Sequence, residues 1–199
     1  MNFEQLGILF TANTHSRGLC RLDIDEAMYM YRVIKLLLRK KNSYERLRVC
    51  EIGTYKGGTT CLLACAGAWI DTIDNYSSKT FDNYKHNPAD DVKCLLEDHK
   101  VLDRCQVWVK DTRKMNNESL HEYYDLLFID GDHSYEGVKA DYNNWIHTLK
   151  VGGQLIFHDS CIAREGATGC EGVMKFVEEL PHKKFYEYAS LTHFIKKAK

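Results

Sequence analysis

Hydrophobic and polar residues alternate in blocks along this chain. Short apolar runs that end in Gly or Asp predict strands over 47–52, 69–74, 106–110, 125–130 and 154–158. Longer stretches with a period near 3.6 residues predict helices over 24–40, 59–66, 90–102, 135–149 and 172–180. Regular alternation of strand and helix is typical of a parallel sheet covered by helices on both faces.

Details of the pattern refine this picture. The helix over 24–40 is expected to begin after Asp23 or Asp25 as its cap and to place Met28 on its apolar face. A turn is expected at Gly152 and Gly153, before the fifth strand. The last two runs, 184–188 and 192–195, are too close for a crossover helix, so an antiparallel hairpin should end the sheet.

Length and charge narrow the function. The 199 residues fit one domain over 1–199, with an N-terminal helical or lid segment over 1–45 and a core over 46–199. The formal net charge of -1 argues against a nucleic-acid partner. No run approaches the ~18 apolar residues that span a bilayer, so no membrane partner and a cytoplasmic location are expected.

The cysteines are numerous but unpatterned. There are eight of them and no CxxC pair, and several lie inside apolar runs. We expect packed thiols rather than a zinc site or disulfides.

A glycine turn follows the first strand. Glu51, Gly53, Gly57 and Gly58 stand where open α/β sheets bind ligands, between a strand and a helix. A dinucleotide fingerprint needs a glycine where Tyr55 stands, and no Gly-Lys-Ser/Thr follows for a phosphate loop. The turn therefore favours a ligand without pyrophosphate, with Glu51 to meet a cationic amino group.

Acids also end the next two strands. Asp74 stands where a carboxylate accepts ribose hydroxyls, and Asp111 where an acid or its backbone meets an adenine amino group. Either acid alone could be solvated or cap a helix. Together with the glycine turn, they favour a nucleoside site.

A second group of polar residues follows strands four and five. Asp130 and Asp159 are expected to converge and share a hard divalent cation, Mg²⁺ being the natural choice. His133 is placed to act as general base on a hydroxyl. The alternative is an ordinary turn at Asp130 and a helix cap at Asp159.

Three segments in this order, 50–60, 128–141 and 152–160, resemble the class I S-adenosylmethionine (SAM)-dependent methyltransferases. The resemblance is closest to small metal-dependent O-methyltransferases of the macrocin type. It implies a Rossmann-like sandwich with a seven-stranded, mostly parallel sheet. It also implies that Glu51 and the turn glycines hold the methionine part of SAM and that Asp74 holds the ribose. The remaining SAM-binding candidates are Thr54, Tyr55, Thr59, Asp111 and Asp130.

The same resemblance implies a catalytic role for Asp130 and His133 and a metal held by Asp130 and Asp159. His158 stands where some relatives place a second acid. Counted as a third ligand, His158 shifts the preference from Mg²⁺ toward Mn²⁺, Fe²⁺ or Zn²⁺.

The expected reaction is O-methylation of a small hydroxylated molecule such as a sugar, natural product or phenol. Segments over 11–22, 76–88 and 163–171 are candidates to cover the acceptor, and Tyr76, Phe81, Tyr84 and Tyr135 to stack on it. The alternatives are a SAM-fold protein without methyl transfer, and a nicotinamide oxidoreductase, which Tyr55 disfavours. Self-association stays open.

Overall fold

The structure, a computed structural model, describes residues 19–78, 81–161 and 169–198. The chain divides into two compact units. The first comprises 1–47 and 54–110, and the second comprises 48–53 and 111–199. The expected single domain over 1–199 stays a prediction, and each unit is described by itself.

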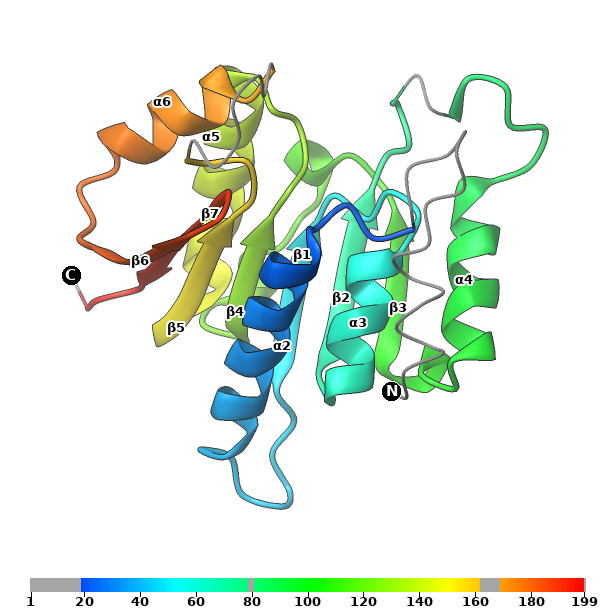
Figure 1. The fold of residues 1–199 in the computed structure, drawn as a ribbon, viewed down its shortest axis with the longest axis horizontal. Coiled ribbons are helices and arrows are strands. Elements are labelled where there is room, and N and C mark those ends of the chain that lie inside the picture. Colours follow the sequence, from blue (N-terminus) through cyan, green and yellow to red (C-terminus); the bar gives the residue numbers. More distant parts are fainter. Residues whose placement is uncertain (1–18, 79–80, 162–168, 199) are drawn as a thin grey trace. The chain divides into compact units, whose positions relative to one another are not determined.

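The first unit is built of helices around two parallel strands. Its elements are α2 (Ile24–Leu38), α3 (Gly58–Ala66), β2 (Trp69–Asp74), α4 (Pro88–Asp98), η2 (Leu102–Arg104) and β3 (Cys105–Val109). β2 pairs with β3 in parallel, with Asp74 beside Val109 at the carboxyl end. α3 packs against α2 and β2, and α4 packs against β3 (Figure 1).

Local sequence explains the helix limits in this unit. Asp23 is the N-cap of α2, and its backbone N–H donates to the Glu26 carboxylate. Asn87 caps α4 and accepts from the backbone N–H of Ala89. The expected helix over 90–102 is wrong at both ends: it begins at Pro88, a residue suited to the first helical turn, and stops at Asp98, before Lys100 turns left-handed at φ 57°.

The apolar face of α2 also differs from the expectation. Met28 is 41% exposed, whereas Met30 and Val33 are buried. Tyr31 is only half-buried. The face toward the core is therefore rotated relative to the predicted one.

The second unit holds the other five strands. Its elements are β1 (Arg48–Ile52), η3 (Thr112–Lys114), η4 (Glu118–Leu120), β4 (Tyr124–Ile129), α5 (Tyr135–Trp145), η5 (Ile146–Thr148), β5 (Leu149–Phe157), α6 (Glu171–Glu179), β6 (Lys184–Tyr188) and β7 (Leu191–Ile195). β1, β4 and β5 run parallel, while β7 pairs antiparallel with both β5 and β6. Every residue of β4 is buried, as expected of a central strand.

Gly152 and Gly153 do not form the expected turn before the fifth strand. They lie inside β5, whose pairing with β4 shifts register. The N–H of Gly152 donates to the carbonyl of Lys196, and the N–H of Lys196 donates to the carbonyl of Gly153. These bonds keep a bent strand in the sheet, which explains why a glycine pair does not end it.

The predicted fold class is confirmed. Seven strands occur among the described residues, in the order β3-β2 in the first unit and β1-β4-β5-β7-β6 in the second. The C-terminal hairpin is antiparallel, as its short connection requires. None of the helices in the described ranges combines the length and apolar character that crossing a membrane requires.

Candidate functional site

The end of β1 is locked against the end of β4 in the second unit. The backbone N–H of Asp130 donates to the carbonyl of Ile52 at 2.8 Å. Gly53 has φ +95°, and a Cβ at this position would lie 2.0 Å from the carbonyl oxygen of Asp130. Glycine is therefore required here by close packing, and not only by the approach of a ligand. The side chain of Glu51, two residues before Gly53, is fully buried.

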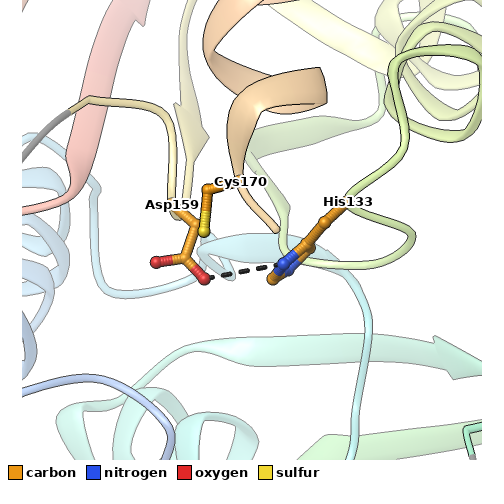
Figure 2. Close-up of side chains that lie close together, drawn as sticks. All are labelled: His133, Asp159 and Cys170. Carbon is orange, nitrogen blue, oxygen red and sulfur yellow. Dashed lines mark ion pairs between the residues drawn. The ribbon is translucent and has the colours of Figure 1, made fainter. Parts of the chain in front are cut away.

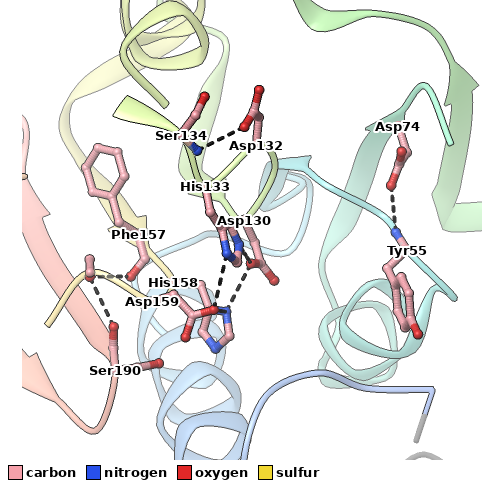
Figure 3. A network of polar contacts seen from close by, with 11 residues as sticks. Tyr55, Asp74, Asp130, Asp132, His133, Ser134, Phe157, His158, Asp159 and Ser190 are labelled. Carbon is pink, nitrogen blue, oxygen red and sulfur yellow. Dashed lines mark hydrogen bonds and ion pairs between the residues drawn. The ribbon is translucent and has the colours of Figure 1, made fainter. Parts of the chain in front are cut away.

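In the first unit, Asp74 fixes the rest of the glycine turn. Its carboxylate accepts from the backbone N–H of Tyr55 at 2.8 Å (Figure 3). It also accepts from the backbone N–H of Tyr76 at 2.7 Å. A contact to a ribose hydroxyl stays a prediction for this carboxylate. The turn then opens α3, where Gly57 is left-handed at φ +79°.

The other turn residues pack inward. The Thr54 hydroxyl lies 2.6 Å from that of Thr72, and the Thr59 hydroxyl lies 3.5 Å from the Cys20 sulfur. A Cβ on Gly58 would lie 2.2 Å from the backbone nitrogen of Cys20. The side chains of Thr54 and Thr59 therefore stabilise the turn, and any role in holding a ligand falls to their backbone.

An aromatic row borders Asp74. The Phe81 ring centroid lies 5.7 Å from that of Tyr55 and 5.2 Å from those of Tyr76 and Tyr84. Phe81 and Tyr76 are buried. Tyr76, Phe81 and Tyr84, expected to stack on an acceptor, thus pack edge-to-face with one another. Tyr135, in the second unit, instead packs against Phe176.

Asp111 is held by its own neighbour. Its carboxylate accepts from the backbone N–H of Arg113 and, at 2.9 and 3.0 Å, from the guanidinium of Arg113. Hydrogen bonds and charge from Arg113 lower the pKa of Asp111 to about 2. The side chain caps η3. Recognition of adenine by Asp111 stays a prediction, and the backbone of Asp111 is the group expected to make that contact.

Four predicted residues gather at the carboxyl ends of β4 and β5 (Figure 3). Asp130 Oδ1 lies 3.0 Å from Nδ1 of His158 and 3.4 Å from Nε2 of His133. Asp159 Oδ2 lies 3.5 Å from Nδ1 of His158 and 3.7 Å from Nδ1 of His133. The structure thus brings together all four residues that the sequence placed at these strand ends.

The electrostatics of this cluster are strongly interdependent. Burial alone would raise the pKa of Asp130, but the charge of His158 and hydrogen bonds from both histidines hold that pKa well below its usual range. The hydrogen bond to Asp130 raises the pKa of His133, against the opposing effect of burial. Asp130 is thus firmly ionised, and His133 retains its proton to higher pH than an isolated histidine.

Two overlapping triads in this region have the composition of metal ligands. The ligand atoms of Asp130, His158 and Asp159 lie within 4.8 Å of one another. The same holds for His133, Asp159 and Cys170. Asp159, common to both, has a left-handed backbone at φ 50°, a conformation that Asp tolerates better than most residues.

Comparison with known proteins identifies the family. Residues 50–160 match a family model described as a methyltransferase domain, and this match covers more than half of the 199 residues. The chain belongs to this methyltransferase family. Its three motifs, with Glu51, Asp130 and Asp159, all fall within the matched range. Membership agrees with the predicted class I methyltransferase and does not support a nicotinamide oxidoreductase.

Individual relatives and solved structures are similar to this chain at low identity. The chain is 28% identical over 141 residues to the uncharacterized protein y4gI of Sinorhizobium fredii. That match covers 67% of this chain but only 15% of y4gI, so the chain spans a small part of that relative. The O-methyltransferase TomG from Streptomyces achromogenes, solved with SAM, is 14% identical with a TM-score of 0.63, covering 90% of this chain and 82% of TomG. The O-methyltransferase NovP is 11% identical with a TM-score of 0.69, covering 98% of this chain and 88% of NovP.

These two structures share the fold of this methyltransferase-family chain. Their likeness supports the Rossmann-like sandwich predicted from the motifs. The macrocin-type subfamily and the individual SAM-binding residues stay predictions.

The predicted acceptor-covering segments are described only in part. Residues 11–18, 79–80 and 163–168, including Gly166, lie outside the described residues. Of the third segment, Gly169 precedes the N-cap of α6, which is Cys170. Sequence reasoning missed Cys170 as a ligand candidate because it has no partner at metal-site spacing. Its eleven-residue distance from Asp159 carries no local signal.

Burial, reinforced by the charge and hydrogen bond of Asp159, raises the pKa of the Cys170 thiol. The thiol therefore keeps its proton beside this carboxylate to a higher pH than an isolated cysteine does.

Proposed function

We propose that this protein transfers a methyl group from SAM to a hydroxyl oxygen of a small molecule, in the manner of the metal-dependent, macrocin-type O-methyltransferases. The convergence of Asp130, His133, His158 and Asp159 at the ends of β4 and β5 carries the proposal. Membership of the methyltransferase family supplies the cofactor class. The O-methyltransferases TomG and NovP, which share the fold, favour oxygen as the atom that receives the methyl.

SAM, when bound, supplies an electrophilic methyl group on a sulfonium. Within the first unit, Asp74 is proposed to accept the ribose hydroxyls, since its carboxylate is fixed by two backbone N–H groups. Gly57 and Gly58, at the start of α3, are also proposed to contact the methionine part of SAM. Glu51 and Gly53 are proposed to contribute from the end of β1.

A divalent cation fits the donor set of the first triad. Asp130 and Asp159 offer carboxylate oxygens, His158 offers an imidazole nitrogen, and waters would complete the coordination. When bound, the cation lowers the pKa of a coordinated hydroxyl. Mg²⁺ suits the oxygens, while His158 extends the range to Mn²⁺ and other transition ions.

His133 is proposed to take the proton of the acceptor hydroxyl. In the structure it donates to Asp130, whose negative charge raises the pKa of His133. Neutralising the charge of Asp130 lowers that pKa toward the ordinary value near ~6.5, which frees the imidazole to act as base at neutral pH. Asp130 therefore links cation binding to base activation.

The acceptor is proposed to be a small hydroxylated molecule such as a sugar, natural product or phenol. The proposed base and the proposed cation both act on a hydroxyl group of the acceptor. The net charge of -1 gives no reason to expect a nucleic-acid substrate.

A direct test is conversion of SAM to S-adenosylhomocysteine with a panel of hydroxylated acceptors, followed by mass spectrometry of the product. We expect turnover that stops on adding a chelator and returns on adding Mg²⁺ or Mn²⁺. Methylation that persists in chelator would contradict the role of the cation. SAM binding without turnover on any acceptor would contradict transfer.

One observation favours a second candidate, a SAM-binding protein that does not transfer methyl. Asp130 and Asp159 already pair with the two histidines in a mutually satisfied network. If that network is purely structural, SAM affinity measured by calorimetry will be the same with and without divalent cations, and no methylated product will form.

A further inference from the structure

The second ligand triad extends the metal chemistry beyond the residues that the motifs supply. His133 Nδ1 lies 3.7 Å from Asp159 Oδ2, and the Cys170 sulfur falls within 4.8 Å of both ligand atoms. Figure 2 shows the Cys170 sulfur and the His133 ring turned toward the Asp159 carboxylate. All three side chains are half-buried, so an ion can reach them.

Packing holds Cys170 beside His133. A Cβ on Gly172 would lie 2.4 Å from the backbone nitrogen of Tyr135 and 2.5 Å from the carbonyl oxygen of His133. Only a glycine lets the first turn of α6 lie against the backbone of 133–135. The contact thereby places the N-cap of α6, which is Cys170, at a fixed distance from His133.

Further contacts make this arrangement rigid. The Tyr135 hydroxyl donates to the Glu179 carboxylate at 2.5 Å, and the Tyr135 ring lies 6.0 Å from that of Phe176. α5 and α6 therefore pack against each other (Figure 1). The two ligands sit at the starts of a packed helix pair, as a preorganised metal site requires.

The donor types indicate the class of ion. Thiolate, imidazole and carboxylate together form a zinc-type ligand set, with three protein ligands and a fourth position for water. Mg²⁺ avoids sulfur and selects oxygen. We propose that His133, Asp159 and Cys170 form a binding site for a zinc-class divalent cation, Zn²⁺ or Co²⁺, that is distinct from the triad containing Asp130.

This proposal shares Asp159 and His133 with the proposed function but needs neither SAM nor an acceptor, and an ion bound at this site would occupy the proposed base. It is tested by binding and not by turnover, so the two proposals can fail separately. The probe is Co²⁺, because a cobalt–thiolate bond gives a charge-transfer absorption that oxygen and nitrogen ligands do not.

The experiment titrates Co²⁺ into the chelator-treated full chain and records absorption spectra. We expect a saturating thiolate band in the wild type and its loss in Cys170→Ser. Calorimetric titration of Zn²⁺ should show affinity reduced by about 10-fold or more in this variant, since even outer-shell changes cost about 10–100-fold. Serine is a favourable N-cap, so Cys170→Ser should preserve α6, which circular dichroism will check.

Two matched variants define the site. Cys161→Ser removes a nearby thiol that donates to the carbonyl of Ala189, and should keep the band. Asp132→Asn changes an exposed neighbouring carboxylate that belongs to neither triad, and should also keep it. A wild type without the band, a band that survives in Cys170→Ser, or a band lost in Asp132→Asn would each overturn the proposal.

Discussion

The turn around Asp74 and the cluster around Asp130 each hold a carboxylate at the end of a strand, but with different kinds of hydrogen-bond donor. Asp74 is satisfied by backbone N–H groups, which do not titrate. Asp130 is satisfied by His133 and His158, whose charges depend on pH and on any bound cation. The first region is thus a fixed cradle, and the second is a set of charges that can be rearranged.

The largest expected effect comes from removing the charge at the centre of the second region. Asp130→Asn should lower methyl-transfer turnover by at least about 100-fold, because general acid–base groups contribute about 10²–10⁴-fold and their partner is lost. Calorimetry should show SAM affinity within a few-fold of wild type.

The matched control is Asp132→Asn, whose side chain is exposed and accepts from the backbone N–H of Ser134. It should retain turnover. If Asp130→Asn also retains turnover, the cluster is not catalytic, and the two regions differ only in their hydrogen-bond donors.

Gly53→Ala should produce the next largest effect, on stability. A Cβ would lie 2.0 Å from the Asp130 carbonyl at a left-handed φ of +95°. Backbone strain costs about 1–2 kcal/mol and overpacking about 1–3 kcal/mol, which together predict a loss of about 2–5 kcal/mol in urea unfolding.

Gly152→Ala separates these two contributions. Gly152 is also left-handed, at φ +78°, but a Cβ there meets nothing within 4 Å. The free energy of unfolding of Gly152→Ala should therefore fall by only about 1–2 kcal/mol, the cost of backbone strain. Equal losses at the two positions would show that close packing against Asp130 is unimportant.

Asp74→Asn tests the fixed cradle. Hydrogen bonds to charged groups are worth about 1.5–3 kcal/mol, so SAM affinity should fall by about 10-fold or more in calorimetry. Turnover at saturating SAM should change much less than in Asp130→Asn. Asp71→Asn, on the same strand and bonded to the Trp108 indole, is the control that should leave SAM affinity unchanged.

The smallest predicted effect is a pH dependence confined to the second region. In the cation-free protein, the raised pKa of His133 means that its pair with Asp130 adds stability below about pH 6.5. That contribution is lost as pH rises through the folded-state pKa. Because His133 is partly exposed, the change should stay below about 1 kcal/mol.

Urea unfolding of wild type and His133→Gln at pH 6 and pH 9 measures this effect by difference. A stability gap between the two proteins that is equal at both pH values would show that the His133–Asp130 pair is not sensitive to charge. The region around Asp74 should show no such difference in either protein.

The sequence predicts what depends on short-range pattern. The apolar run of β4 predicts a buried strand, and the short connection of the hairpin predicts an antiparallel pair. Both predictions are confirmed. Convergence at the strand ends follows from parallel topology, which is why Asp130 and Asp159 could be paired in advance. The turn predicted at Gly152 and Gly153 is wrong because a glycine pair is compatible with a turn and with an irregular strand alike.

What escaped prediction depends on packing between distant segments. Cys170 reaches His133 only because Gly172 lets α6 lie against the 133–135 backbone. Nothing in the spacing of these residues encodes that contact. Likewise, the guanidinium of Arg113 donates to the Asp111 carboxylate. The pattern of acids at strand ends does not predict this contact.

The left-handed backbone of Asp159 has an evolutionary consequence. Glycine would relieve the conformation at φ 50°, so drift toward greater stability favours losing the carboxylate that both triads share. Retaining Asp there means accepting a locally less stable backbone in return for ligand chemistry. Asn tolerates the same conformation without the charge, so relatives with Gly or Asn at this position are expected to lack the proposed cation sites.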